Sequence, residues 1–367
     1  MKLSISRDQL LKPLQQVSGV VEKRQTLPVL ANVLMVVEAG KLSLTGTDLE
    51  VELVSRSELA AEFVDGEITV PARKLLDICK SLPSSAEVEL KVDGQKLVLK
   101  SGKSRFSLAT LPANEFPNLE EGLGSFSFNI GQKALKRLID KTAFAMAQQD
   151  VRYYLNGMLF EVSNGMLRTV ATDGHRLAMC TETAEAGTAD KVQVIVPRKG
   201  VQELSRLLSD EDGLVSLTLG TNHIRATVGN VTFTSKLIDG KFPDYERVLP
   251  KGGDKVVLAN RDELKQSLHR AAILSNEKYR GIRLQLSNEL LKIQANNPDQ
   301  EEAEEDVSVE YSGNPLEIGF NVSYLQDVLN VLQGANAKVV LGDSNSSALL
   351  SEVDSNDALY VVMPMRL

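Results

Sequence analysis

The sequence predicts an α+β protein made of three tandem copies of one domain. A helix-like stretch with one apolar register occurs three times in the 367 residues, at 70–82, 196–210 and 320–332, with offsets of 126 and 124. A strand-like stretch recurs as well, because 42–48, 167–173 and 291–297 align at offsets of 125 and 124. A period this long indicates a triplicated domain, since solenoid repeats span about 20–50 residues. We expect domains at 1–125, 126–253 and 254–367.

Each copy is expected to contain two amphipathic helices. Apolar side chains at i, i+3 and i+7 predict opening helices at 7–21, 131–146 and 260–275 and second helices at 71–82, 197–209 and 321–333. Pro13 conflicts with the first of these, because a proline removes a backbone hydrogen bond. Alternating apolar and polar residues predict strands between the helices. These strands are expected at 30–37, at 42–53 around a glycine-containing turn, and at 87–92, 96–100, 105–111, 154–162, 166–180, 215–219, 222–228 and 231–237.

Composition indicates a protein of the cytoplasm. The amino terminus lacks the apolar core of a secretory signal, and there is no apolar run of 18 residues. The two cysteines, Cys79 and Cys180, form neither a disulfide framework nor a metal set, which fits a reducing compartment.

The charge is unevenly distributed along the chain. The net charge is −8, but the helix windows 8–18, 72–81, 132–147, 198–209, 261–275 and 321–333 together carry +7, so the remainder carries −15. If the helices share one surface, that surface is electropositive, as in a protein that binds phosphate backbones without reading bases. The alternative is that these lysines and arginines cover ordinary solvated helix faces.

The sequence contains no motif for catalysis, a metal or a cofactor. Gly102 to Ser104 resembles the end of a phosphate loop, but Leu97 stands where the first glycine belongs. His175 and Cys180 are separated by an odd offset on one predicted strand, so they should face opposite sides. The carboxylates at 299–306 lack the spacing of a calcium loop. They form either a solvated acidic face or a partner for lysines and arginines of another subunit.

Five strings resemble the bacterial β sliding clamp family, the processivity subunits of DNA polymerase III. They lie at 149–158, 171–177, 196–200, 241–245 and 361–367. The resemblance implies clamp-type domains with two helices packed on antiparallel sheets, in a head-to-tail homodimer that closes into a ring around duplex DNA without sequence preference. It further implies a non-enzymatic tether for the DNA polymerase III catalytic subunit, the clamp-loader complex, and other polymerases and repair proteins that carry short clamp-binding peptides.

The resemblance also assigns residues to two surfaces. The residues expected to contact DNA are Arg24, Arg73, Gln149, Tyr153 and Tyr154. For the two tyrosines, interior packing or the partner groove is the alternative. The groove for partner peptides is expected between the second and third copies, formed by Arg152, Leu155, Thr172, Gly174, His175, Arg176, Leu177, Pro243, Arg247, Val248, Asn321, Tyr324, Ser347, Val361, Val362, Met363, Pro364, Met365 and Arg366. Methionines suit a groove that accepts several peptides.

A third surface is expected at the subunit contact. We expect Ile273 and Leu274 to pack against Phe106 and Leu108 of the other subunit. Opposite charges should flank this contact, with Glu301, Glu302, Glu304 and Glu305 facing Lys74, Lys96, Lys103 and Arg105. The competing hypothesis is a cytosolic peptide-binding scaffold that never encircles DNA. Retention on circular but not on linear DNA separates the two.

Overall fold

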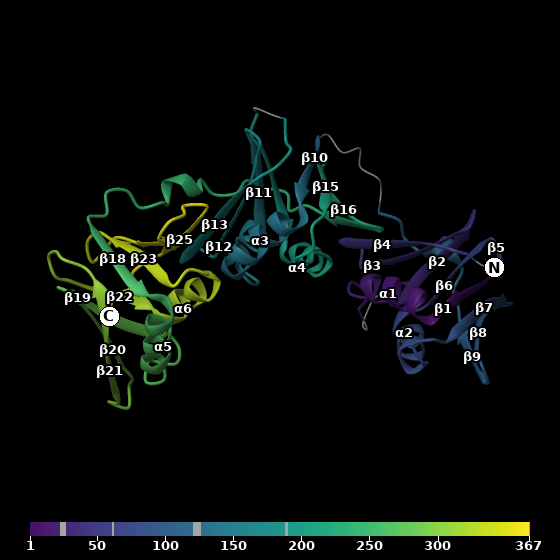
Figure 1. The fold of residues 1–367 in the computed structure, drawn as a ribbon, viewed down its shortest axis with the longest axis horizontal. Helices are drawn as coiled ribbons and strands as arrows, with labels where there is room; N and C mark the ends of the chain where they lie inside the picture. The colour runs from purple at the N-terminus through teal and green to yellow at the C-terminus, as the bar shows by residue number, and fades with distance from the viewer. Residues whose placement is uncertain (23–26, 61, 120–125, 188–189, 367) are drawn as a thin grey trace. The chain divides into compact units, whose positions relative to one another are not determined.

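The computed structural model describes residues 1–22, 27–60, 62–119, 126–187 and 190–366. The chain divides into two compact units, and the division passes through the second copy of the repeat. Unit 1 consists of Met1–Lys133 and Lys199–Leu237, and unit 2 consists of Ala134–Arg198 and Ile238–Leu367. Figure 1 shows the elements of both units.

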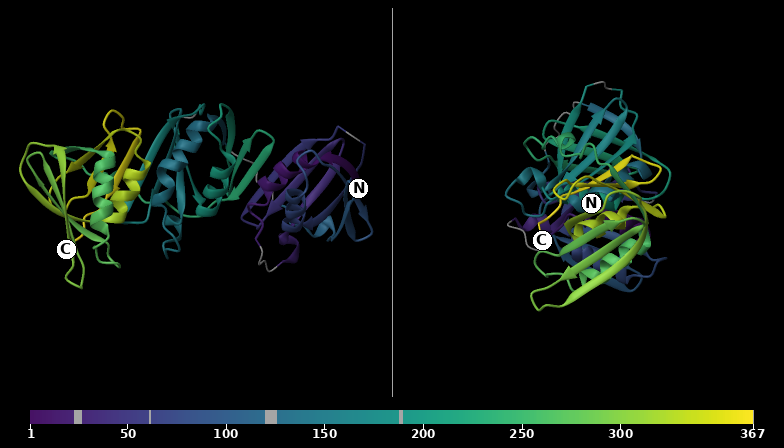
Figure 2. Two further views of the ribbon diagram at one scale, coloured as in Figure 1. Left: turned by 60° about the horizontal axis from the view of Figure 1, so that its bottom comes forward. Right: turned by 90° about the vertical axis from the view of Figure 1, so that its left-hand side faces the viewer.

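The described residues form six α-helices, two for each copy, as predicted. They are α1 Arg7–Val17, α2 Ala72–Ser81, α3 Gln132–Thr142, α4 Arg198–Leu207, α5 Arg261–Ala272 and α6 Val322–Val331. Pro13 is buried within α1 and does not end the helix. Ser6 and Asn260 accept hydrogen bonds that cap α1 and α5. In Figures 1 and 2, α1 lies beside α2 in unit 1 and α5 lies beside α6 in unit 2.

Unit 1 contains two antiparallel sheets. The five-stranded sheet has the order β5 Phe63–Val64, β1 Lys2–Ser6, β7 Glu87–Asp93, β8 Lys96–Ser101 and β9 Ser104–Ala109. The eight-stranded sheet has the order β10 Phe126–Gly131, β15 Leu214–Leu219, β16 His223–Val228, β17 Val231–Lys236, β4 Val51–Glu58, β3 Lys41–Thr47, β2 Asn32–Glu38 and β6 Gly66–Pro71. Strands of the first and second copies therefore share one sheet, joined where β17 pairs with β4.

Unit 2 contains one sheet of twelve strands that joins the second and third copies. Its order is β14 Val192–Pro197, β11 Gly157–Ser163, β12 Met166–Thr172, β13 Arg176–Thr183, β25 Ala358–Val362, β24 Ala348–Glu352, β23 Asn336–Leu341, β18 Lys255–Asn260, β21 Glu302–Glu310, β20 Leu290–Asn296, β19 Gly281–Ser287 and β22 Leu316–Asn321. The copies meet where β13 pairs with β25. Short 3-10 helices complete the elements: η1 Pro28–Ala31, η2 Ala113–Glu115, η3 Ala143–Ala145, η4 Tyr153–Leu155 and η5 Tyr245–Arg247.

The repeat predicted from the sequence is present in the structure. β3, β12 and β20 begin at residues 41, 166 and 290, which reproduces the offsets of 125 and 124. α2, α4 and α6 begin at residues 72, 198 and 322, with offsets of 126 and 124. Equivalent positions in the three copies can therefore be compared residue by residue.

Three strand predictions need correction. The stretch 166–180 is two strands, because the chain turns at Asp173–His175 between β12 and β13, and Gly174 has a φ of 89°. His175 therefore lies in a turn and not on the strand that carries Cys180. The stretch predicted at 154–162 begins with η4, and its strand starts at Gly157. The stretch 42–53 is two strands around a turn, as predicted, but the turn lies at residues 48–50, and Gly46 lies inside β3, where a Cβ would meet the carbonyl oxygen of Val17 at 2.5 Å.

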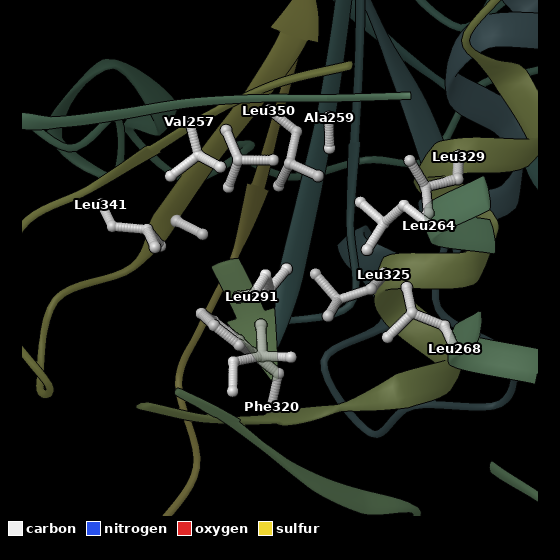
Figure 3. A pocket seen from close by; sticks show the side chains of 13 residues that line it. Val257, Ala259, Leu264, Leu268, Leu291, Phe320, Leu325, Leu329, Leu341 and Leu350 are labelled. Atoms are coloured by element: carbon white, nitrogen blue, oxygen red, sulfur yellow. The ribbon is translucent and has the colours of Figure 1, made fainter. Parts of the chain in front are cut away.

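The core of the third copy lies between its helices and the sheet. Figure 3 shows Leu264 and Leu268 of α5 and Leu325 and Leu329 of α6 facing the strands. They surround an apolar space of about 30 Å³. This space is part of the packed core, because only apolar side chains line it. Among the described residues, no helix has the length and apolar character needed to cross a membrane.

Candidate functional site

The junction of the second and third copies carries a buried apolar cluster. Leu177 of β13 pairs with Val361 of β25 in the sheet. Both side chains belong to a cluster with Phe242, Tyr245, Leu159, Val170, Met179 and Ile195. Tyr154, Ile238, Leu249, Leu349 and Leu359 pack against this cluster and are partly buried. Leu177 and Val361 thus form an apolar floor that continues under the segment 238–250.

The turn before β13 has a fixed backbone geometry. The Asp173 carboxylate accepts hydrogen bonds from the backbone N–H groups of His175 (2.9 Å) and Arg176 (3.1 Å). Gly174 has a φ of 89°, and a Cβ there would lie 2.9 Å from a guanidinium nitrogen of Arg152. Glycine is therefore favoured by its positive φ, whereas the approach of Arg152 constrains it less, because the tip of that exposed side chain can shift.

Arg176 connects the two copies through charge and aromatic contacts. Its guanidinium forms ion pairs with Asp173 of the same turn and with Asp327 of α6. It lies over the ring of Tyr324, 4.6 Å from the centroid, and donates to the carbonyl of Phe144 at 3.0 Å. The side chain is only 12% exposed. Arg176 therefore fixes the position of Tyr324 relative to β13.

The chain end crosses the same junction. Met363 donates its backbone N–H to the carbonyl of His175 (3.0 Å), and Met365 donates to the carbonyl of Gly319 (2.9 Å). Met363 itself is 46% exposed. Because the backbone is held on both sides, the thioether of Met363 is presented to solvent beside the apolar floor.

Two loops form the sides of this region. Arg152 is exposed and forms a two-point contact with Asp150, at 3.0 and 2.9 Å. The side-chain hydrogen bonds from Arg152 lower the pKa of Asp150 to about 2. On the other side, a cleft of about 880 Å³ is lined by Arg247, Val248, Ser347 and neighbours that include Leu249 and Leu349. The exposed Val248 gives this side an apolar surface.

The structure brings most of the predicted groove residues to one junction. Thr172, Gly174, His175, Arg176 and Leu177 form the turn and the start of β13; Asn321 and Tyr324 come from the start of α6; Pro243, Arg247 and Val248 come from the segment 238–250; Ser347 precedes β24; and Val361, Val362, Met363, Pro364, Met365 and Arg366 form β25 and the tail. Leu155, the last residue of η4, is buried.

Sequence reasoning missed several residues of this junction. Phe242, Tyr245, Leu249 and Leu349 belong to the apolar cluster, and Asp327 is the carboxylate that meets Arg176. Asp327 could have been found from the repeat, because the equivalent positions of α2 and α4 carry Asp77 and Glu203.

The residues expected to contact DNA differ in exposure. Arg73 and Gln149 are exposed, and Tyr153 is 58% exposed. Tyr154 is partly buried, because it packs against the apolar cluster that contains Leu177 and Val361. Arg24 lies outside the described residues.

The residues expected at the subunit contact lie on α2, on β8, β9 and the turn between them, at the start of β21 and just after the end of α5. Ile273 is 69% exposed, whereas Phe106 is half-buried and Leu108 is 8% exposed within its own sheet. Glu304 and Glu305 form ion pairs with Lys292 and Arg270 of the same chain. Among the described residues, Glu301 and Glu302 have no ion pair within the chain.

The described residues hold no candidate metal cluster, and both cysteines are buried. No group of three His, Cys, Asp or Glu residues among them is placed to hold a metal ion. Burial raises the pKa of the Cys79 and Cys180 thiols to about 11, so both are protonated at neutral pH.

Three copies of a two-helix domain on antiparallel sheets, with a buried apolar cluster and an adjacent cleft where two copies meet, define a clamp-type binding protein. Comparison with protein families places the chain within one such class. Residues 1–120, 129–244 and 246–366 match the models of the N-terminal, central and C-terminal domains of the DNA polymerase III beta subunit. The chain belongs to this family, the beta sliding clamps, which are non-catalytic processivity subunits.

Individual relatives agree over their full lengths. The chain is 66% identical to the beta sliding clamp of Pseudomonas aeruginosa and 56% identical to that of Escherichia coli K12, each over 367 residues and 100% of both chains. A crystal structure of the P. aeruginosa sliding clamp bound to griselimycin superposes with a TM-score of 0.98 at 66% identity, covering 100% of both chains.

Proposed function

We propose that two copies of this chain associate head to tail into a closed ring around duplex DNA. The ring tethers DNA polymerase III and other replication and repair proteins to their template in the cytoplasm. We assign the three domains to residues 1–125, 126–253 and 254–367; the three family models match residues 1–120, 129–244 and 246–366.

The observation that carries the ring is the way neighbouring copies share a sheet. At the first junction β4 pairs with β17, and Leu53 lies opposite Phe233. At the second, β13 pairs with β25, and Ala178 lies opposite Tyr360. Because 53 and 178 are equivalent positions (offset 125), as are 233 and 360 (offset 127), the two junctions have the same register.

By the same equivalence, one strand of the third copy and one strand of the first copy could pair to form a third junction. The equivalent of β4 and β13 in the third copy is β21, and the equivalent of β17 and β25 in the first copy is β9. β9 is the last strand of its sheet, and residues 302–308 of β21 pair with a neighbour on one side only. Two such edges close a head-to-tail dimer when they pair between subunits, with Phe106 opposite Ala303.

The first helix of each copy supports the same contact. Gly19, Phe144 and Ile273 lie just after the C-terminal ends of α1, α3 and α5. They are equivalent positions, because α1, α3 and α5 begin at offsets of 125 and 129. A Cβ on Gly19 would lie 2.6 Å from the Glu203 carboxylate of the next copy, and Phe144 lies 5.9 Å from Tyr360 of the next copy. Ile273 is 69% exposed in the single chain, so it is available to the next subunit together with Leu274.

Charge flanks the proposed contact on both sides. Glu301 and Glu302 would face Lys74, Lys96, Lys103 and Arg105, which are exposed. Glu304 and Glu305 already have partners within the chain, so they contribute less than the other two.

DNA contacts must be weak for a ring to slide. Arg24, Arg73, Gln149, Tyr153 and Tyr154 are assigned to this role, with Tyr154 shared with the groove. Long side chains attract phosphates without reading bases, and a contact worth several kcal/mol would arrest motion. A closed ring needs no tight contact, because it stays on DNA through topology, and it keeps a bound polymerase at a high effective concentration.

The groove at the second junction binds partner peptides. Leucine or phenylalanine side chains fit the floor of Leu177 and Val361 between Val248 and Met363. Each buried anchor contributes about 1.5–3 kcal/mol, so two anchors reach roughly micromolar affinity, which permits exchange of partners.

The ring is tested by DNA topology. Protein loaded onto nicked circular DNA should survive washing at about 0.5 M salt and should leave when the circle is cut once. A groove binder of similar charge loses about a thousandfold in affinity with salt whatever the topology. Equal loss from circular and linear DNA would support the non-encircling scaffold instead.

A further inference from the structure

A row of polar side chains crosses three strands on the face of the sheet that the segment 238–250 covers. Glu161 of β11 is paired in register with Arg168 of β12 and with Gln193 of β14. The Glu161 carboxylate accepts a hydrogen bond from the Gln193 amide at 2.5 Å and lies 3.7 Å from Arg168 and 3.3 Å from Lys191. Its side chain is only 4% exposed.

Tyr245 of η5 packs over this row and forms hydrogen bonds with two of its members. Its hydroxyl donates to Glu161 at 2.8 Å and accepts from the Arg168 guanidinium at 3.0 Å. Burial raises the pKa of Tyr245, so the hydroxyl remains a donor at neutral pH. Burial disfavours the charged form of Glu161, but hydrogen bonds from Tyr245, Gln193 and Lys191 outweigh this and hold its pKa below the usual value. The carboxylate therefore stays ionised.

The equivalent positions in the third copy show how the segment 238–250 changes the exposure of this row. Gln285, Lys292 and Glu317 occupy the places of Glu161, Arg168 and Gln193, and Gln285 donates to Glu317 at 3.1 Å. That bond is exposed to solvent. In the second copy Glu161 is buried, because Tyr245 of the segment 238–250 lies over it, whereas Arg168 is partly exposed and Gln193 is exposed. Burying a carboxylate costs desolvation free energy, which its four partners offset, so removal of one partner should destabilise the protein.

The segment held by this row forms one wall of the groove. Phe242 and Tyr245 are 7% and 3% exposed, whereas Pro243, Arg247 and Val248 next to them are exposed. Tyr245 gives the segment a buried polar contact with the sheet and Phe242 gives it an apolar one, while the exposed Glu246 adds an ion pair with Lys191 at 3.4 Å. Loss of the Tyr245 hydroxyl would thus free η5 to shift, and Val248 would shift with it.

We propose that Glu161, Arg168 and Tyr245 are positioning residues for the partner-peptide groove. They do not contact the peptide. They fix the position of the wall residues Pro243, Arg247 and Val248 relative to Leu177 and Val361, so that two apolar side chains of a peptide fit between them. This inference rests on the proposed peptide-binding function of the groove. It adds to that function a specific cause for the position of one wall.

The test compares two tyrosine hydroxyls. Tyr245→Phe removes the donor to Glu161. Tyr311→Phe is the matched control, because Tyr311 is also buried (7% exposed) and its hydroxyl donates to a single carbonyl, that of Asn314 at 2.7 Å, in a loop outside the groove. Polarisation of a fluorescein-labelled nine-residue peptide with a leucine and a phenylalanine near its end reports affinity. We expect Tyr245→Phe to weaken binding about three- to tenfold and Tyr311→Phe to leave it unchanged.

A second variant separates positioning from a general loss of stability. Glu161→Gln keeps the shape of the side chain but removes the charge, and it should weaken the peptide by a similar factor. The double variant should bind no more weakly than the weaker single one, because both changes break one contact. Hydrogen exchange at residues 243–249 should be faster in both variants and unchanged in the control.

The outcomes distinguish this inference from the function on which it rests. If the unmodified protein fails to bind the peptide, the groove assignment itself is wrong. If it binds, and Tyr245→Phe binds equally well, or if the losses in the double variant simply add, the row is only a structural part of the sheet and the proposal is overturned.

Discussion

The junction of the first and second copies and the junction of the second and third copies share one backbone plan but differ in what they can bind. Asp48 and Asp173 accept the same pair of backbone hydrogen bonds in the turns before β4 and β13. Lys236 and Met363 are also equivalent, and they donate to the carbonyls of Glu50 and His175 at 2.8 and 3.0 Å. The two junctions therefore share the same backbone hydrogen bonds at these turns.

Side chains make the difference between the two junctions. At the first, Val51 is buried where the second has Arg176, and Lys199 of α4 closes the turn through ion pairs with Asp48 and Glu22. At the second, Tyr324 stands where α4 has Gly200, and Arg176 holds its ring. A few substitutions therefore convert a closed junction into one with an aromatic wall beside an apolar floor.

The strongest test of this comparison concerns the third junction, which we place between subunits. Ile273→Ala together with Leu274→Ala should produce folded monomers, because each truncation at a buried contact costs roughly 2–5 kcal/mol. Leu214→Ala is a suitable control, since Leu214 is a similarly exposed aliphatic (63%) on β15. Sedimentation at low concentration measures the outcome. A double variant that stays dimeric there would show that the subunits meet elsewhere.

The next test compares the ion pairs of the two internal junctions. Arg176→Ala leaves Asp173 and Asp327 without their shared cation and should lower the stability of unit 2 by about 2–3 kcal/mol, with loss of peptide binding. Lys199→Ala at the first junction should cost about 1 kcal/mol or less and leave peptide binding intact, because Lys199 is more exposed (28% against 12%). Thermal melting and peptide polarisation read out both effects. Equal loss of binding in the two variants would contradict the assignment of the groove to the second junction alone.

Sequence alone predicted the repeat because its signal is a period of apolar residues, which survives in every copy. It could also place Leu177 and Val361 near one another, once a family resemblance was available. It could not predict that Glu161 is buried, because the equivalent Gln285 lies on an exposed face and only the covering segment makes the difference. It joined β12 and β13 although Asp173–His175 contains an Asp-Gly dipeptide, a turn signal that the prediction overlooked. Contacts between distant segments, such as Arg176 with Asp327, depend on tertiary structure.

A smaller effect should distinguish the junctions by pH. Lys141 is buried at the second junction, where it donates to the carbonyl of Val331 and lies 3.7 Å from Glu352, whereas the first copy has Gln16 at this position. Burial lowers the pKa of Lys141 below its usual value, opposed by Glu352. Between the folded and unfolded pKa values the unfolded chain binds more protons, so stability should rise with pH in that alkaline window. Lys141→Gln should flatten this rise in melting temperature, and an unchanged slope would assign it to other groups. Glu352 keeps two backbone donors, at Gln333 and Gly334, so the variant should fold.

The smallest expected effect is a gain. Tyr360 is fully buried in β25, and its hydroxyl has no hydrogen-bond partner among the described residues. The equivalent residue of β17 at the first junction is Phe233, which is buried to the same degree without a polar atom. An unsatisfied buried hydroxyl costs about 1–3 kcal/mol, so Tyr360→Phe should leave stability unchanged or raise it by about 1 kcal/mol. The reverse change, Phe233→Tyr, should destabilise the first junction by a similar amount, because it buries a hydroxyl in an apolar site. Melting temperatures of the two variants provide the measurement. A clear loss of stability in Tyr360→Phe would mean that the hydroxyl has a partner, such as a buried water, and that the second junction contains a polar contact that the first one lacks.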